Sequence, residues 1–344
     1  MPRAFGADGA ALLERLGSLA QVARVDSFTE DDGPERGARR VRLVNGGGLE
    51  IEVHPDRALD LGRVTVDGVP VAWLSPPGMA APALAEREGG GWLRTFGGGL
   101  LATCGLDAYG PAGSDADGSW GQHGRVGSTP ARVTRAETTD AEVVLEGIVR
   151  QTGVFAENLV LRRRISSPLG SDLLLIEDEV TNEGFAEVPH MVLYHLNLGW
   201  PLLDEGTVVE IPSDDVRARD ADAEAGAAEW NTIPAPIPGF REQVFMHTFD
   251  SDGSVTVRVG NTRLGLTFVL TFDAGSLPGL SEWKMTGQGH YALGIEPSNT
   301  PHFGRADARA AGALPTLAPG ASASYRLALR LTRGTAPETP GGSR

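Results

Sequence analysis

Short apolar or alternating segments recur along most of the chain between residues 40 and 333. They are rich in leucine and β-branched residues and are bounded by Gly, Asn, Asp or Pro, as in RRVRLVNG, LEIEVHP, EVVLEGIV and LGLTFVLTFD. Segments of this kind are typical of β-strands. Because no long helices alternate with them, the pattern favours a large, mostly antiparallel, all-β sandwich over a doubly wound α/β fold.

Two local signals refine this prediction. Leucines at helical spacing within ALLERLGSLAQ predict one short N-terminal helix, and these are Leu12, Leu13, Leu16 and Leu19. In VTVDGVPV, Asp67 and Gly68 separate two alternating runs, as a tight type I′ hairpin turn requires.

The same patterns predict how the chain is organised. We expect an N-terminal helix and lead-in over 1–40, a single β domain over 41–333, and a flexible tail over 334–344. An acidic, alanine-rich stretch at 214–229, followed by a proline-rich exit, is typical of a surface excursion and not of a domain linker.

Charge and composition narrow the partners. The 344 residues carry a formal net charge of -15, which argues against nucleic acid, because phosphate binding needs clustered Lys and Arg. No segment resembles a signal peptide and no apolar run is long enough to cross a bilayer, so we expect a cytoplasmic protein without a membrane partner. The single cysteine, Cys104, follows LLAT and is interpreted as a buried small residue.

His123 and Arg125 stand out in GSWGQHGRVGSTP, a stretch with few side chains to bury, in a chain with only 7 histidines. Glycine on both sides lets the backbone turn tightly and lets another group approach closely. Both residues are therefore candidate ligand contacts.

Two later stretches carry polar side chains in apolar settings. In YHLNLG, His195 and Asn197 lie two apart on a predicted strand, so their side chains share one face. Glu296 follows the apolar run YALGI, where a second, later strand is expected to end. A carboxylate partly withdrawn from water has a raised pKa, which suits it to accept a proton near neutral pH. Each alone fits an ordinary core histidine or surface glutamate, but their joint occurrence favours a site.

The order HG, then HxN, then a late LEP-like motif resembles the galactose mutarotase, or aldose 1-epimerase, superfamily. Within it, GWLRTFGGGLLATCG, QHGRVGSTP, YHLNLGWPLL and GIEPSNTP resemble a little-studied branch known mainly as a domain of unknown function. The resemblance runs from about residue 56 to the end of the chain. It implies a β-supersandwich with the site in a cleft on one sheet.

The resemblance also implies roles for individual residues. It matches His195 to the general acid, Glu296 to the general base, and His123 to a histidine that helps to hold the sugar's ring oxygens. Arg94 lies about where the superfamily keeps a substrate-binding arginine. The remaining candidates for substrate contacts are Arg125, Asn197, His247, Lys284 and Asn299.

Tryptophan faces stack well on the C–H faces of sugars. Trp120 and Trp200 each lie within five residues of a candidate histidine, so the sequence favours them as stacking platforms in the cleft.

Together these features favour an aldose 1-epimerase-like enzyme that acts on a free sugar or sugar derivative, a small-molecule carbohydrate, without a cofactor or metal. Two alternatives stay open. His123, His195, His247 and Glu296 could hold a divalent metal and support a keto-sugar isomerase or lyase. The chain could also be a noncatalytic carbohydrate-binding module on the same fold.

Overall fold

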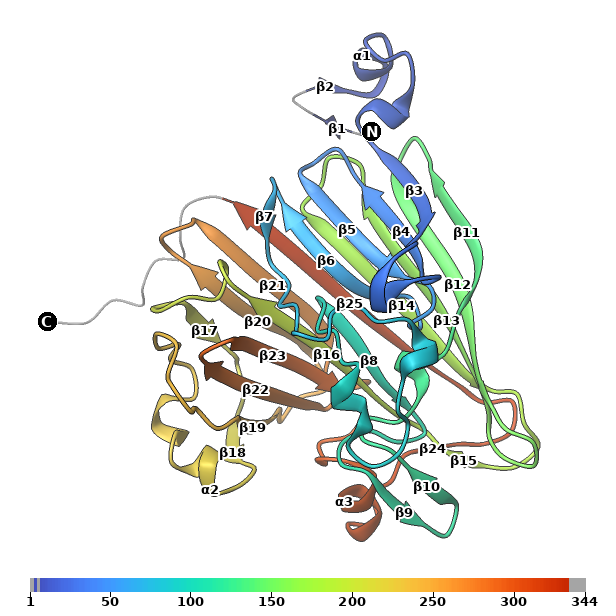
Figure 1. The fold of residues 1–344 in the computed structure, drawn as a ribbon, viewed down its shortest axis with the longest axis vertical. Helices are drawn as coiled ribbons and strands as arrows, with labels where there is room; N and C mark the ends of the chain where they lie inside the picture. The colour runs from blue at the N-terminus through green and yellow to red at the C-terminus, as the bar shows by residue number, and fades with distance from the viewer. Residues whose placement is uncertain (1–2, 5–6, 334–344) are drawn as a thin grey trace, which may run out of the picture.

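The computed structural model describes residues 3–4 and 7–333, and two large β-sheets dominate it (Figure 1). Neighbouring strands within each sheet pair antiparallel, as the sequence predicts. In spatial order, the strands of the eight-stranded sheet are β11 Arg132–Thr138, β12 Glu142–Thr152, β13 Asn158–Pro168, β14 Leu173–Asn182, β25 Ser322–Arg333, β21 Leu266–Asp273, β20 Ser254–Asn261 and β17 Val208–Glu210.

The eleven-stranded sheet carries the residues of the site described below. In spatial order its strands are β18 Asp215–Ala218, β19 Gln243–Thr248, β22 Gly279–Gly287, β23 His290–Ser298, β16 Met191–Gly199, β8 Leu101–Leu106, β6 Asp60–Val66, β5 Leu49–His54, β4 Arg39–Val44 and β3 Arg24–Thr29, with β7 Val69–Pro70 paired to β6.

The remaining elements are short. Three two-stranded ribbons pair β1 Arg3–Ala4 with β2 Ala7–Asp8, β9 Gly113–Asp115 with β10 Gly118–Trp120, and β15 Val188–Pro189 with β24 Thr316–Leu317. The α-helices are α1 Gly9–Leu13, α2 Ala221–Glu224 and α3 Arg305–Ala310, and the 3-10 helices are η1 Leu19–Gln21, η2 Gly33–Glu35, η3 Pro82–Leu84, η4 Gly91–Arg94, η5 Val126–Ser128 and η6 Ala227–Glu229. Within residues 3–4 and 7–333, no helix has the length and apolar character to cross a membrane.

Three local predictions can be compared with these elements. Asp67 and Gly68 form the predicted hairpin turn, with φ of 48° and 76° between the paired ends of β6 and β7. The N-terminal helix is shorter than its leucine spacing suggests, because the chain leaves α1 after Leu13 and the Ser18 hydroxyl accepts from Ala20 N–H to begin a separate turn. The predicted flexible tail lies outside the described residues.

The stretch at 214–229 is not a simple surface excursion, as the sequence pattern suggested. Its first part is β18, the edge strand of the larger sheet, which pairs with β19. Its second part contains α2, whose first turn Asp220 caps by accepting a hydrogen bond from the Ala223 N–H.

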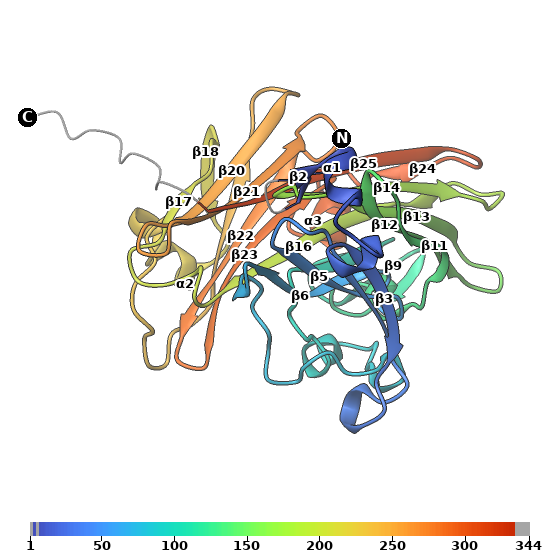
Figure 2. The ribbon, with the colours of Figure 1, turned by 90° about the horizontal axis from the view of Figure 1, so that it is seen from above.

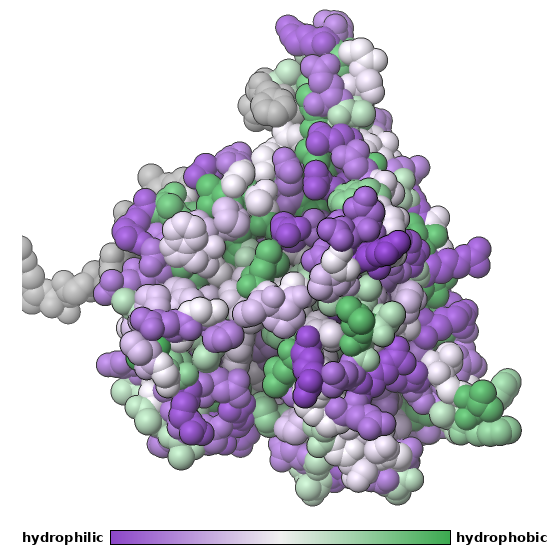
Figure 3. Space-filling model, viewed as in Figure 1, coloured by the Kyte–Doolittle hydropathy of each residue, from purple (hydrophilic) through white to green (hydrophobic). Residues whose placement is uncertain are grey.

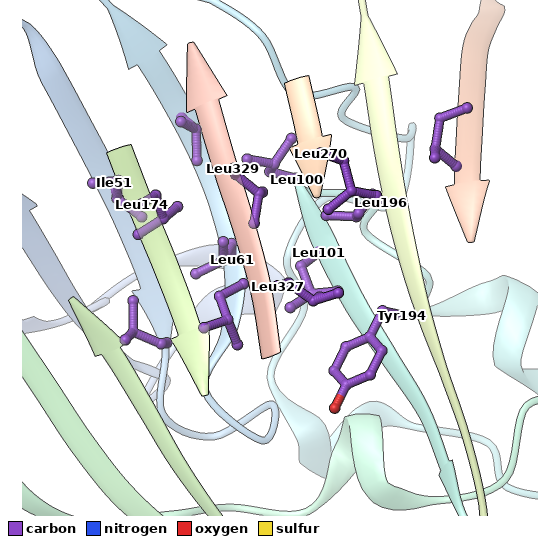
Figure 4. Packing of buried hydrophobic residues seen from close by; sticks show 14 of the residues in the cluster. Ile51, Leu61, Leu100, Leu101, Leu174, Tyr194, Leu196, Leu270, Leu327 and Leu329 are labelled. Carbon is purple, nitrogen blue, oxygen red and sulfur yellow. The ribbon is translucent and has the colours of Figure 1, made fainter. Parts of the chain in front are cut away.

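Apolar side chains from both sheets meet between them. Figure 2 shows the two layers from above, and Figure 4 shows side chains from both layers in contact. Leu61, Leu101 and Leu196 come from the larger sheet, while Leu174 and Leu329 come from the smaller one, and all are almost completely buried. Cys104 is also fully buried, as predicted, in a separate small cluster.

A buried ion network also joins the sheets. Arg163 on β13 donates to both Asp178 oxygens at 2.9 and 2.7 Å and to Asp60 of the larger sheet at 3.2 Å. Tyr194 of the larger sheet donates to Asp178 at 2.8 Å. Strand alternation explains why one arginine of the RRR run points inward while Arg162 pairs with acidic residues nearer the surface.

Candidate active site

A cleft of about 960 Å³ lies on the face of the larger sheet that points away from the other sheet. In Figure 3 the surface is recessed between the part that carries α2 and the part that carries β9 and β10. Its lining is largely aromatic and apolar, and the side chains that could act on a ligand are Ser75, Gln122, His123, His195, Arg219, Glu242, His290 and Glu296.

His195 and Glu296 are in contact with each other in this cleft. They lie on neighbouring strands, β16 and β23, whose register places Leu196 opposite Ile295. His195 Nε2 is 3.2 Å from Glu296 Oε1, and each residue is only 5% exposed. The sequence pattern placed Glu296 at the end of its strand. The strand β23 instead continues to Ser298, so Glu296 lies within it. Alternation explains the placement of His195, since Leu196 and Leu198 point into the core between the sheets.

Burial separates the proton affinities of this pair. Burial raises the pKa of Glu296 to about 8, the negative charge of Glu242 adds to this rise, and Arg219 opposes it. Burial lowers the pKa of His195 well below its ordinary value, and a charge on His123 would lower it further. At neutral pH the pair therefore holds one proton, with Glu296 as its favoured carrier.

His123 reaches the same cleft from the loop between β10 and η5. Its ring centroid lies 5.9 Å from that of His195, and burial lowers its pKa to about 4, so it is neutral at pH 7. Its backbone has a φ of 59°, and the following Gly124 has a φ of 72°. A side chain on Gly124 would collide with the Ala108 and Gly105 carbonyls, so this glycine admits neighbouring backbone and not a ligand.

Aromatic rings surround His195. Trp283 and Phe96 lie 5.5 and 5.3 Å from it, measured between ring centroids. Trp73 contacts both of these rings, and Trp92 stacks on Phe96 at 4.0 Å. An arc of rings therefore shields the histidine from water and offers faces for stacking on a ligand.

These are not the tryptophans that the sequence favoured. Trp120 is buried away from the cleft, where its indole N–H donates to the Pro111 carbonyl, and Trp200 is 66% exposed. A short distance in sequence from a histidine did not predict a place in the cleft. Trp120 is separated from His123 by a turn, and Trp200 follows the end of the strand that carries His195.

Arg219 and Glu242 are two functional candidates that the sequence reasoning missed. Their side chains form an ion pair of 3.0 Å, and Glu242 also accepts from the Trp283 indole N–H at 2.9 Å. Across the cleft, the Arg219 guanidinium lies 5.3 Å from the centre of the Phe303 ring. Arg219 lies inside the stretch first interpreted as a surface excursion, so no sequence signal pointed to it.

Three predicted contacts lie outside the residues that line the cleft. Arg94 is largely exposed and pairs with Glu86, although it belongs to the same short helix as Trp92. Arg125 pairs with Glu157 and donates to the Thr152 carbonyl. Asn299 accepts from Val192 N–H and donates to the His190 carbonyl, so it supports backbone.

Three more candidates lie within the sheet but do not line the cleft. Asn197 shares a strand face with His195, yet its amide donates to the Gly99 and His195 carbonyls. His247 and Lys284 point to the opposite face of the sheet from Trp283, where His247 lies 3.4 Å from Glu282 and Lys284 donates to the Glu229 carbonyl.

The proposed metal set does not converge, because His247 lies on the other face of the sheet from the His195–Glu296 pair. Across the part of the chain that the structure describes, no group of three or more His, Cys, Asp or Glu side chains could hold a metal ion.

Comparison with known proteins agrees with this architecture. A solved protein from Klebsiella pneumoniae subsp. pneumoniae MGH 78578, proposed to be an aldose 1-epimerase, is 26% identical, with a TM-score of 0.82 over 89% of this chain and 83% of that one. A galactose mutarotase-like protein from Clostridium acetobutylicum is 16% identical, with a TM-score of 0.66 over 90% of this chain and 99% of that one. No curated protein matches the chain.

A third solved structure shares the fold at low identity. The galactose 1-epimerase of Lactobacillus acidophilus NCFM is 13% identical, with a TM-score of 0.59 over 90% of this chain and 99% of that one. At the level of families, the match covers residues 35–331 and is to the family described as a domain of unknown function, DUF4432. The chain therefore belongs to the DUF4432 family and has the galactose mutarotase-like β-supersandwich fold.

Proposed function

We propose that the chain is an aldose 1-epimerase that interconverts the anomers of a free sugar by acid–base ring opening, without a cofactor. The observation that carries the proposal is the buried contact between His195 and Glu296, which are 3.2 Å apart on the floor of an aromatic cleft. Similarity to the Klebsiella protein supports the same reaction class.

The reaction needs one proton donor at the ring oxygen and one proton acceptor at the anomeric hydroxyl, the two oxygens bonded to the anomeric carbon. Glu296, as a carboxylate, accepts the proton of the anomeric hydroxyl, and His195, as an imidazolium, donates a proton to the ring oxygen. The bond between C1 and the ring oxygen then breaks and gives the open aldehyde. Rotation about the bond between C1 and C2, followed by the reverse proton transfers, returns the other anomer with no net change in protons.

One proton on the pair is sufficient for this cycle. In the free cleft Glu296 is its favoured carrier, so the proton passes to His195 before ring opening. Nε2 and Oε1 lie 3.2 Å apart without a hydrogen bond between them, so this transfer needs a small rotation of one of the two side chains. His123, which is neutral at pH 7, lies close enough to hydrogen-bond a sugar oxygen beside the pair.

Polarimetry across a panel of aldoses, uronates and sugar phosphates tests the proposal, with the spontaneous rate subtracted. We expect acceleration of at least one sugar, with activity that survives treatment with a chelator. Failure to accelerate any sugar, with binding retained, would replace the enzyme assignment by a carbohydrate-binding module. One tightly held metal per chain, with activity lost to the chelator, would support the metal-dependent isomerase or lyase instead.

A further inference from the structure

We propose that the substrate is an uncharged reducing oligosaccharide of at least two sugar units. Its reducing ring would lie on the His195–Glu296 pair, and its next ring would extend along β22 and β23 toward His290. This inference rests on the proposed epimerase function and names the substrate class of the same site.

The length of the cleft is the first observation. Glu296 and His290 both line it, and they lie six positions apart on β23. Residues an even number apart share a strand face, and a rise of about 3.3 Å per residue separates these two by roughly 20 Å. One pyranose ring on the catalytic pair would cover only the Glu296 end of this length.

The surface beyond the catalytic pair suits a second ring. Trp283 on β22 pairs with Gly294 on β23, and Met285 pairs with Ala292. Each large apolar residue of β22 therefore faces a small residue of β23. Both Trp283 and Met285 line the cleft. An aromatic face and a polarisable thioether bind the apolar C–H face of a sugar, while the small residues keep the floor low.

The volume points the same way. The cleft measures about 960 Å³. Pockets of about 300–1,000 Å³ hold drug-sized ligands, and this value is close to the upper limit. A free hexose would leave much of the aromatic lining in contact with water.

Charge argues for an uncharged ligand. Among the lining residues that the structure describes, Arg219 is the only Lys or Arg, and it already pairs with Asp220 and Glu242. A phosphate or carboxylate in the outer cleft would therefore lack a free cation and would lie near the Glu242 carboxylate. The hydroxyl groups of an uncharged sugar can instead bond to both members of this ion pair without desolvating a charge of their own.

The test compares wild-type kcat/KM for anomer interconversion on matched sugars, by exchange NMR above the spontaneous rate. Maltose, cellobiose, isomaltose, lactose and melibiose all have glucose as their reducing unit and are compared with glucose. A galactobiose, with galactose as its reducing unit, is compared with galactose, and glucuronate and glucose 6-phosphate serve as charged comparators. We expect at least one disaccharide to exceed its matched monosaccharide by about tenfold, mainly through a lower KM, which corresponds to about 1.4 kcal/mol.

A variant locates the second ring. Met285→Trp fills the outer cleft and should lower the ratio of disaccharide to monosaccharide kcat/KM about tenfold. Gln288→Trp is the matched control, because it adds the same side chain in the exposed turn between β22 and β23, outside the cleft lining. That control should keep the wild-type ratio.

The outcomes separate the two proposals. Acceleration of each monosaccharide equal to or better than that of its matched disaccharides, or a preference for a charged sugar, overturns this inference and leaves the epimerase function in place. Acceleration of no sugar overturns both. The wild-type comparison decides the matter even if Met285→Trp does not fold, and an unchanged ratio in a folded Met285→Trp protein also overturns the inference.

Discussion

Three unpaired buried atoms belong to the residues around the proposed reaction. His123 Nδ1, His195 Nδ1 and Glu296 Oε1 are inaccessible to solvent and lack a hydrogen-bond partner within the protein. Most buried polar atoms in folded proteins are paired, since an unpaired one costs about 1–3 kcal/mol. This cost is consistent with a site whose polar groups are arranged for a ligand and not for stability.

We expect the rate of anomer interconversion to be bell-shaped in pH, because the cycle needs one proton on the pair. Burial raises the pKa of Glu296 to about 8, so the proton is lost and the rate falls as the pH rises through about 8. Burial lowers the pKa of His195 well below 6.5, so a second proton binds, and the rate falls, only at acidic pH. Polarimetric kcat/KM between about pH 4 and pH 10 measures both limbs, which belong to the coupled pair. A rate that still rises above about pH 9 would contradict the one-proton mechanism.

Sequence reasoning found the three residues of the proposed chemistry but few of the other side chains that line the cleft. His123, His195 and Glu296 are conspicuous because charged or titratable groups are unusual in glycine-rich or apolar segments, and the structure brings them into one cleft. The sequence pattern favours Lys284, yet its neighbour Trp283 lines the cleft, because adjacent strand residues point to opposite faces. Which face is the open one depends on where the second sheet packs, and local sequence does not contain that information.

At the scale of elements, the hairpin of β22 and β23 forms the floor of the cleft. Gly294 lies on this floor beside His195 and Glu296. A Cβ on Gly294 would lie 2.6 Å from Glu296 Oε1, 2.9 Å from the Trp283 Cβ and 3.3 Å from His195 Cε1. The absence of a side chain there lets the pair and the tryptophan approach one another.

Gly294→Ala should therefore lower kcat/KM by about tenfold or more, because even a small displacement of the pair misaligns the reacting groups. Its unfolding midpoint in urea should also fall, because the 2.9 Å contact with the Trp283 Cβ forces the packed floor to shift. The activity comparison therefore uses the folded protein. Gly287→Ala in the same hairpin is the control, because its closest contact is the flexible end of Met285 at 3.0 Å. Equal activity in the two alanine variants would show that the floor does not position the pair.

Elements were predictable where turn chemistry or alternation is strong. Asp67 and Gly68 specify their turn because both adopt positive φ, which these residue types tolerate. The strand β18 was missed, because its sequence DVRA is short, polar and followed by alanines, and only pairing with β19 makes it a strand. Tertiary pairing thus overrode the local preference at the edge of the cleft.

At the scale of the whole molecule, Arg163 is the centre of the buried ion network that joins the two sheets. It is buried between them and is held by Asp178 of its own sheet and Asp60 of the other. Burial raises the pKa of Asp60 to about 6, although Arg163 counteracts this effect. Tyr194 of β16, the strand that carries His195, also donates to Asp178, so the network contacts the core side of this strand.

Arg163→Met should lower the free energy of unfolding by about 3–5 kcal/mol, because it leaves two buried carboxylates without their cation. Arg162→Met is the matched control on the same strand, where a part-exposed ion pair contributes about 0–1 kcal/mol. Urea unfolding at neutral pH gives both values. Similar losses in the two variants would mean that the buried network does not hold the sheets together.

The sequence predicts the fold class but not the order of strands. β25, the last strand, lies between β14 and β21 in the smaller sheet, and β16 lies between β23 and β8 in the larger one. These neighbours are far apart in the chain, and alternation alone does not distinguish one apolar partner from another. The long-range pairings nevertheless place His123, His195 and Glu296 together.

The central claim is that the His195–Glu296 pair accelerates anomer interconversion, and Glu296→Gln tests it most directly. Glutamine keeps the side-chain shape but cannot accept the hydroxyl proton. On the sugar that the wild type accelerates most, exchange NMR should show a fall in rate of about 10²-fold or more, while calorimetry shows retained binding. A Glu296→Gln protein that keeps the full wild-type rate on that sugar would contradict the account.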